Sequence, residues 1–214
     1  MIYATNSDAT YAASQLVPSD IIVQGATLVV NGGVFDSVVC TTQSVQYARE
    51  PPLEAINKFL VQGTLLLCQV RQYPGDQHIE DLLIRTLVFD DKDVHQRNDI
   101  GRQRELFRNM INCFAENPRD ETWSEHWIRF MHEGFRMAIG RVFCMTKNGY
   151  FGLVPAGVRN GDQVCLFYGG SVPFIIRPVG NRNYRLIGHG YFHGLMHGQA
   201  FNLHSFRGQK IVLE

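Results

Sequence analysis

The sequence predicts an α+β fold in which a helical block, residues 51–140, lies between two β segments. Three observations lead to it. β-Branched runs broken by glycine fill residues 1–50, apolar residues at helical spacing follow, and short strands with regular turns fill residues 141–214. Regular strands at this spacing predict a small β-barrel or strongly curved antiparallel sheet at the C-terminal end. We expect one domain, 1–214, whose β segments can join into one sheet.

The N-terminal segment is expected to contain three short strands. Residues 21–23, 27–30 and 34–39 are rich in β-branched side chains. Asn31, Gly32 and Gly33 separate the last two runs, and such residues are typical of a turn. Two prolines at 51–52 then end the β segment and can open a helix.

The middle of the chain has the periodicity of amphipathic helices. Apolar residues recur at helical spacing from Leu53 and again from Ile79, and a third such stretch covers residues 106–114. A fourth helix is expected from Thr122, because Glu125 stands three residues later in capping-box spacing. Residues 90–101 are polar and charged, which is typical of a surface loop.

The C-terminal segment shows alternating short β runs and turn residues. Turns are expected at residues 147–149, 160–162, 169–170 and 180–181, where glycine, asparagine and aspartate gather. The runs between them predict strands at 141–145, 150–153, 163–167, 174–177, 184–187, 191–195 and 210–213.

Charge and composition exclude several classes of partner. The chain has 20 basic and 20 acidic side chains, so it lacks the cationic excess that duplex binding needs. No apolar run approaches the ~20 residues that span a bilayer, and no signal peptide is visible at the N-terminus. The five cysteines are scattered, which favours a reducing compartment. We therefore expect a cytoplasmic protein that binds neither nucleic acid nor membrane.

Residues 150–201 resemble the C-terminal region of fungal heterokaryon-incompatibility (HET) proteins. The stretch from Tyr11 to residue 39 also resembles the part that follows the HET domain in that family. The helical middle is similar only in general character. The matching motif residues are Gly149, Tyr150, Gly152, Leu153, Pro155, Gly161, Asp162, Val172, Pro173, Phe174, Arg177, Pro178, Tyr184, Leu186, Gly188, Tyr191, His193, Gly194, Met196 and Gly198.

Two departures from the family pattern bear on function. The resemblance places the HET effector domain upstream of Tyr11, where ten residues stand, so we expect this chain to lack the effector activity. The family tends to carry acidic residues where this chain has His189, His197 and Gln199. The resemblance therefore points to these positions as the ones that distinguish the chain from its relatives.

Candidate site residues come from the His-rich end and from the aromatic helix. His189, His197 and Tyr191 are candidate catalytic donors that could polarise a carbonyl group. An apolar pocket could be lined from the helix that starts at Thr122, although an aromatic stripe at helical spacing is more often part of a core. The candidate substrate-binding residues are Trp127, Met131, Phe135, Arg136 and His193.

No metal or cofactor is expected. His189, His193 and His197 are four residues apart, and such residues on a strand are separated by ~13 Å, too far to share one zinc ion. The phosphate-loop, dinucleotide-binding and nucleophile-elbow motifs are all missing from the sequence.

Two functional hypotheses of different classes follow. The first is a cofactor-independent cyclase or isomerase of fungal specialised metabolism, acting on a small apolar metabolite, for example by a Diels–Alder-type cyclisation. The alternative is a binding module for non-self recognition or regulation of the heterokaryon-incompatibility type, without effector activity. Its partner would be another protein or a second copy of the chain.

Overall fold

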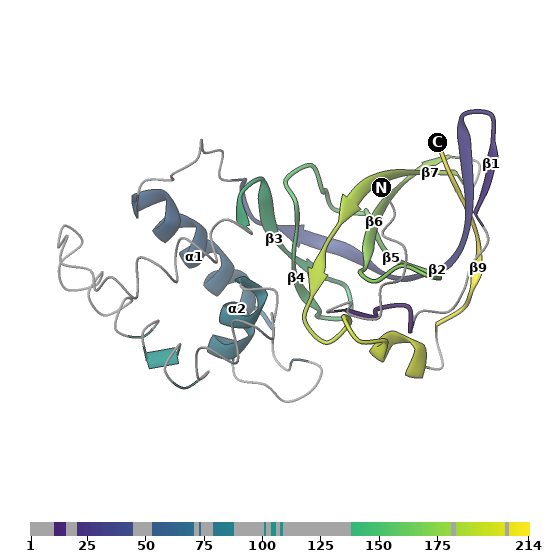
Figure 1. Cartoon of the computed structure of the whole chain (residues 1–214). Helices are drawn as coiled ribbons and strands as arrows, with labels where there is room; N and C mark the ends of the chain where they lie inside the picture. Colours follow the sequence, from purple (N-terminus) through teal and green to yellow (C-terminus); the bar gives the residue numbers. More distant parts are fainter. Residues whose placement is uncertain are drawn as a thin grey trace.

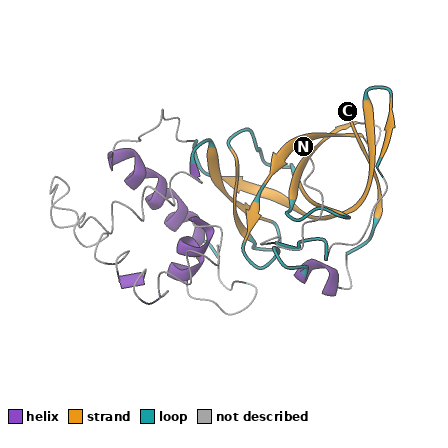
Figure 2. Ribbon diagram, in the orientation of Figure 1, coloured by secondary structure: helices purple, strands orange, loops and turns teal. Residues whose placement is uncertain are grey.

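The computed structural model describes residues 11–15, 21–44, 53–70, 73, 79–87, 101, 104–105, 108, 138–180, 183–203 and 206–214. Within them the chain is mostly β, with helices to one side of a ring of strands (Figures 1 and 2). The strands are β1 (Ile22–Gln24), β2 (Thr27–Thr41), β3 (Arg141–Thr146), β4 (Phe151–Pro155), β5 (Gln163–Phe167), β6 (Phe174–Gly180), β7 (Asn183–His189), β8 (Tyr191–Phe192) and β9 (Gln209–Leu213). The helices are α1 (Leu53–Leu67) and α2 (Ile79–Leu87), with a 3₁₀ turn, η1 (Gln199–Asn202).

The long strand β2 organises the whole sheet, because four other strands pair with it. Its first half pairs with β1 and β9, its middle with β5 and its end with β3. The path β2–β5–β6–β7–β9 returns to β2, so these strands close into a barrel. The pairs are antiparallel except for β7 with β9, which run parallel.

A second sheet continues from the end of β2 and consists of β3, β4 and the short β8. The register of β2 shifts between Val34 and Asp36 and again between Val38 and Cys40. Such bulges bend a strand and increase its twist. They allow β2 to leave the barrel and enter the second sheet.

Three apolar clusters hold the layers together. Side chains of β3 and β4 alternate between two of them, as the two-residue period of a strand requires. Phe143 and Leu153 pack with α1 and α2, whereas Val142 and Val154 pack toward the barrel. The third cluster is the barrel core and contains Val30, Cys165, Phe167, Ile176, Ile211 and Leu213.

The turn predicted at Asn31–Gly33 is wrong, because β2 runs straight through these residues. Gly32 and Gly33 serve close packing instead of chain reversal. A Cβ atom on Gly32 would lie 2.5 Å from the carbonyl oxygen of Leu166 on the neighbouring strand. A glycine in a strand interior often marks such close backbone approach.

The predicted helices that begin at Leu53 and Ile79 are confirmed as α1 and α2. Residue 108 is described and helical, but the rest of the stretch 106–114, the stretch 122–137 and most of the loop 90–101 lie outside the described residues. The extent of the helical block to residue 140 therefore stays a prediction. Among the described residues, no helix has the length and apolarity to cross a membrane.

The two β segments do join, as expected, because β2 pairs with β3, β5 and β9. The strand predicted at 163–167 is confirmed at the same bounds as β5. The strand predicted at 191–195 is too long, since β8 ends at Phe192 and a turn follows. Gly194 has a φ of 81° in that turn, a conformation that glycine adopts without strain.

Candidate functional site

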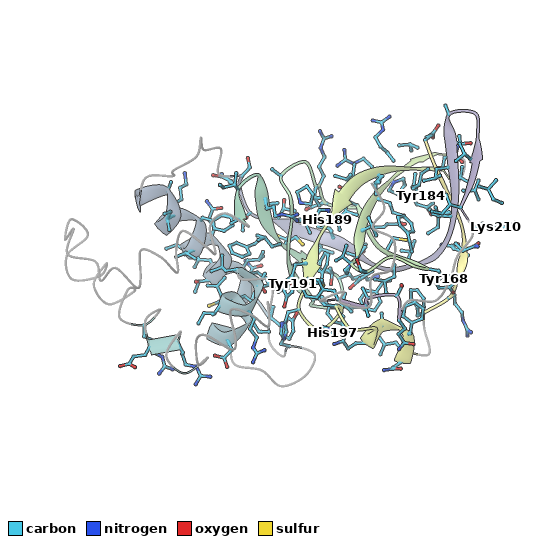
Figure 3. All side chains as sticks on the ribbon, in the orientation of Figure 1. Tyr168, Tyr184, His189, Tyr191, His197 and Lys210 are labelled. Carbon is cyan, nitrogen blue, oxygen red and sulfur yellow. The ribbon has the colours of Figure 1, made fainter. Side chains whose placement is uncertain are left out.

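The His-rich segment lies where the second sheet meets the barrel. His189 ends β7, Tyr191 belongs to β8, and His197 lies in the turn before η1. Figure 3 shows these three labelled residues between the helices and the ring of strands in that view. The segment is therefore held by the barrel on one side and by the second sheet on the other.

The centre of the segment is a buried polar cluster. Tyr191 is 2% exposed and His193 is 6% exposed. The Tyr191 hydroxyl lies 2.9 Å from Nδ1 of His193, within hydrogen-bonding distance. Both side chains are thus engaged inside the protein, as buried polar groups generally are.

Tyr73, which lies between α1 and α2 in the chain, joins this cluster to the helical layer. Its hydroxyl donates to the carbonyl oxygen of His193 at 2.8 Å and accepts from the backbone N–H of Phe151 at 3.3 Å. Burial raises the pKa of Tyr73 well above its usual value, so the hydroxyl stays protonated and available as a donor. It bridges β4 and the chain after β8 at the point where their strand pairing ends.

His189 contacts a different partner, Arg141 at the start of β3. The guanidinium donates to the His189 carbonyl oxygen at 3.0 Å, and its second terminal nitrogen lies 2.8 Å from Nε2 of the imidazole. Partial burial and the positive charge of Arg141 both lower the pKa of His189. The imidazole is therefore neutral at pH 7, accepts at Nε2, and carries its proton on Nδ1.

His197 is exposed and belongs to the turn. Its backbone N–H donates to Oε1 of Gln199 at 2.8 Å, and its ring centroid lies 6.0 Å from that of Tyr11. Tyr11 in turn lies 6.3 Å from the ring of Tyr191. The N-terminal segment thus packs across the turn that carries His197.

Of the three predicted catalytic residues, Tyr191 and His197 both lie against Tyr11, whereas His189 contacts Arg141. Tyr191 also contacts His193. Their catalytic role stays a prediction. The strand spacing used to argue against a zinc site is wrong for His193 and His197, because the chain turns after Phe192. Among the described residues, no group of three metal-ligating side chains is placed to hold an ion.

Most of the predicted substrate-binding residues cannot be compared with the structure. Trp127, Met131, Phe135 and Arg136 lie outside the described residues. His193 is described, and its side chain is buried against Tyr191. An aromatic wall built from the helix that starts at Thr122 therefore stays a prediction.

A second polar cluster fixes the connection between β4 and β5. Arg177 on β6 donates to both carboxylate oxygens of Asp162, at 2.7 and 2.8 Å, and to the carbonyl oxygen of Gly157 at 2.8 Å. Asp162 is 2% exposed and also accepts from the backbone N–H of Arg159 at 2.8 Å. Hydrogen bonding to Asp162 raises the pKa of Arg177 further above its usual value. The sequence motif contains both residues, but their separation in the chain gave no sign that they pair.

One motif glycine also has a clear packing role. A Cβ atom on Gly152 of β4 would collide with the carbonyl oxygen of Tyr191 on the paired strand β8 and would lie 2.6 Å from the Phe192 ring. Only glycine lets these strands approach so closely. Gly152 and the Asp162–Arg177 pair thus hold neighbouring parts of the β structure together.

These features define the class of protein. It is a β-barrel module joined through β2 to a second sheet, and the polar residues of its sequence motif make internal contacts. The chain belongs to the Het-6 β-barrel domain family, whose model matches residues 77–207. It is also similar to heterokaryon incompatibility protein 6, OR allele, of Neurospora crassa. The two are 28% identical over an alignment that covers 58% of this chain and 21% of that protein.

The chain thus spans about a fifth of the length of the curated relative that it matches. No solved structure matches it. The resemblance to the C-terminal region of heterokaryon-incompatibility proteins is confirmed, as is a β-barrel. These matches favour the binding-module hypothesis over the cyclase hypothesis, which gains no support from them.

Proposed function

We propose that this chain is a protein-binding module of the heterokaryon-incompatibility type, which acts in non-self recognition or in its regulation. One observation carries the proposal: the chain belongs to the Het-6 β-barrel domain family and is similar to a protein named for heterokaryon incompatibility. Because a fold alone does not define a function, the proposal also needs support from the surface of the module.

The arrangement of polar groups supports recognition over catalysis. Tyr191, His193, Asp162 and Arg177 bond to one another in two internal clusters, which leaves their polar atoms engaged. The side chains available to a partner are the exposed ones, and the buried packing below them can keep the surface shape constant. Loops and strand ends on a rigid scaffold are the usual carriers of binding specificity.

His189 and His197 suit such a role because both are exposed at the edge where the second sheet meets the barrel. His189 presents its imidazole beside the cation of Arg141, so this part of the surface combines a ring nitrogen with guanidinium donors. We infer that changes at these two positions alter partner choice without altering the fold.

The direct test is genetic. The chain is expressed from one promoter in a panel of fungal strains that differ in their heterokaryon-incompatibility genotype, and the growth and fusion competence of transformants are scored. We expect the response to depend on the recipient genotype, because a recognition module acts only where its partner is present. A D162A chain serves as the control for a destabilised module.

An equal response in every strain, with the chain shown to be folded and present, would overturn the proposal. Consumption of a metabolite from extracts of a strain lacking the gene, lost in H189A and H197A variants, would support the cyclase hypothesis instead. The two outcomes are separable because the first is scored in cells by genotype and the second by chromatography of small molecules.

A further inference from the structure

Arginines gather where the connection between β4 and β5 meets β6 and β7. Residues 141–189 contain five arginines and one lysine but only one acidic residue, Asp162, although the whole chain has 20 basic and 20 acidic side chains. Three of these arginines lie on the elements that meet at Asp162, and we call them the arginine patch: Arg159, Arg177 and Arg185. A local excess of one charge sign raises the concentration of oppositely charged ligands at a surface.

Strand register sets two members of the patch directly opposite each other. Arg177 of β6 pairs with Arg185 of β7 in antiparallel register. The Cβ atoms of such a pair lie ~5 Å apart on one face of the sheet, and like charges at these positions destabilise the pairing. Both carboxylate oxygens of Asp162 accept from Arg177. The single carboxylate thus balances Arg177, and the charge of Arg185 stays uncompensated.

Arg185 is open to a ligand. Its side chain is exposed and makes no ion pair with any residue that the structure describes. The C-terminal residue Glu214 lies nearby, because its backbone N–H donates to the carbonyl oxygen of Tyr184 at 2.9 Å. Glu214 is exposed as well, and no ion pair joins it to Arg185. The guanidinium therefore keeps its donors for a group from outside the chain.

The connection between β4 and β5 brings Arg159 to the same surface. Arg159 is exposed, and its backbone N–H donates to the Asp162 carboxylate at 2.8 Å. Arg177 also donates to the carbonyl oxygen of Gly157 in this connection, at 2.8 Å. A Cβ atom on Gly157 would have one neighbour within 4 Å, the side chain of Ile187 on β7 at 4.0 Å. The connection is thus fixed beside β7 and open to solvent, as a binding loop on a rigid scaffold is.

We infer that the arginine patch binds an acidic segment of a partner protein, whose aspartate or glutamate carboxylates pair with Arg159 and Arg185. A guanidinium pairs with a carboxylate through two parallel N–H···O bonds, and Arg177 holds Asp162 in this way. A bound carboxylate would also offset the repulsion between Arg177 and Arg185. A peptide is favoured over a nucleic acid because the chain as a whole has no cationic excess. The inference names the chemistry of a partner for the proposed binding module and rests on that proposal.

The test is the fluorescence anisotropy of a labelled peptide in which aspartate alternates with serine, titrated with the purified full chain at low ionic strength. Wild type should bind this peptide at least about 10-fold more tightly than the same peptide with asparagine in place of aspartate. Added salt should weaken the binding, because solvent ions screen exposed charges.

Charge-removing variants locate the binding on the patch. R185Q should weaken binding of the aspartate peptide about 3-fold and R159Q/R185Q about 10-fold, since each exposed ion pair contributes modestly. K210Q is the control, because it also removes one exposed positive charge. Lys210 pairs with Asn31 of β2, and Figure 3 shows it across the ring of strands from His189. K210Q should bind the peptide like wild type.

Three results would overturn the inference, once circular dichroism shows that each variant is folded. They are equal binding of the aspartate and asparagine peptides by wild type, an equal effect of R159Q/R185Q and K210Q, and tighter binding of an oligothymidylate that carries the same charge as the peptide. The inference and the proposed function fail separately. The peptide test uses only the purified chain, whereas the proposed function is scored by the genotype of the responding strains.

Discussion

Tyr191 and His193 lie in the same short segment as His189 and His197, yet the two pairs have opposite environments. The first pair is buried and hydrogen-bonded within the protein, whereas both members of the second pair are exposed. The same contrast holds for the Asp162–Arg177 pair, whose carboxylate is buried beneath the β4–β5 connection. The buried residues Tyr191, His193 and Asp162 therefore stabilise the module, whereas the exposed histidines are open to contact with a partner.

The comparison predicts the largest loss of stability for D162A. This variant removes a buried carboxylate that accepts two hydrogen bonds from Arg177 and one from the backbone of Arg159. Breaking such a pair should lower the free energy of unfolding by about 3 kcal/mol. Urea denaturation followed by circular dichroism measures the change.

The matched control is R159A, whose exposed side chain makes no ion pair in the part of the chain that the structure describes. R159A should unfold within about 0.5 kcal/mol of wild type. Equal free energies of unfolding for D162A and wild type would contradict the claim that the buried Asp162–Arg177 pair stabilises the module.

A smaller effect is expected for Y73F, which keeps the ring but removes the hydroxyl between His193 and Phe151. Leaving a buried carbonyl and a buried N–H without this partner should cost about 2 kcal/mol. Y168F is the control, since the Tyr168 hydroxyl makes no hydrogen bond to any described residue. If Y73F and Y168F have the same melting temperature, the hydroxyl of Tyr73 does not stabilise the contact between β4 and the chain after β8.

Y191F tests the centre of the buried cluster. The change removes the hydroxyl that lies 2.9 Å from Nδ1 of His193 and preserves the packing of the ring. The expected cost is about 1 kcal/mol, the usual net contribution of one hydrogen bond. The folded Y191F protein should also keep the response that depends on the genotype of the fungal strain, because this hydroxyl is not on the surface. Loss of the response from a stable Y191F protein would mean that Tyr191 acts in function directly.

The smallest effect concerns His189 and is best seen through pH. Its folded-state pKa is depressed, so near pH 6.5 the unfolded chain binds this proton more readily than the folded one. The contribution of neutral His189 to the free energy of unfolding is fully present above the pKa of the unfolded chain. It is lost as the pH falls from that value through the lower pKa of the folded protein. H189Q should remove this part of the slope, a change below about 0.5 kcal/mol because solvent screens an exposed group. If the free energies of unfolding of wild type and H189Q change equally between pH 7.5 and pH 5, the assigned effect of His189 is wrong.

Sequence patterns predicted the elements that depend on local residues. β5 and the starts of α1 and α2 follow from periodicity and turn residues close to each element. The turn expected at Asn31–Gly33 failed because Gly32 serves the close approach of β5, a contact between residues far apart in the sequence. Closure of the barrel likewise depends on the parallel β7–β9 pair, which no local pattern indicates.

The candidate site was predictable as a region but not as a set of contacts. The row of histidines drew attention to residues 189–197, where the structure places an exposed surface beside a buried cluster. Nothing in the sequence joined Tyr73 to His193, or Arg141 to His189, because each contact links residues that are distant in the chain. Chain topology decides which polar residues are internal.

The most direct test of the central claim compares wild type with the H189A/H197A double variant across the panel of incompatibility genotypes. The double variant should be as stable as wild type in urea and should still produce a genotype-dependent response, with a changed set of responding strains. The opposite result is equally clear. A folded wild-type chain that acts the same in every strain would show that this Het-6 β-barrel module does not serve recognition.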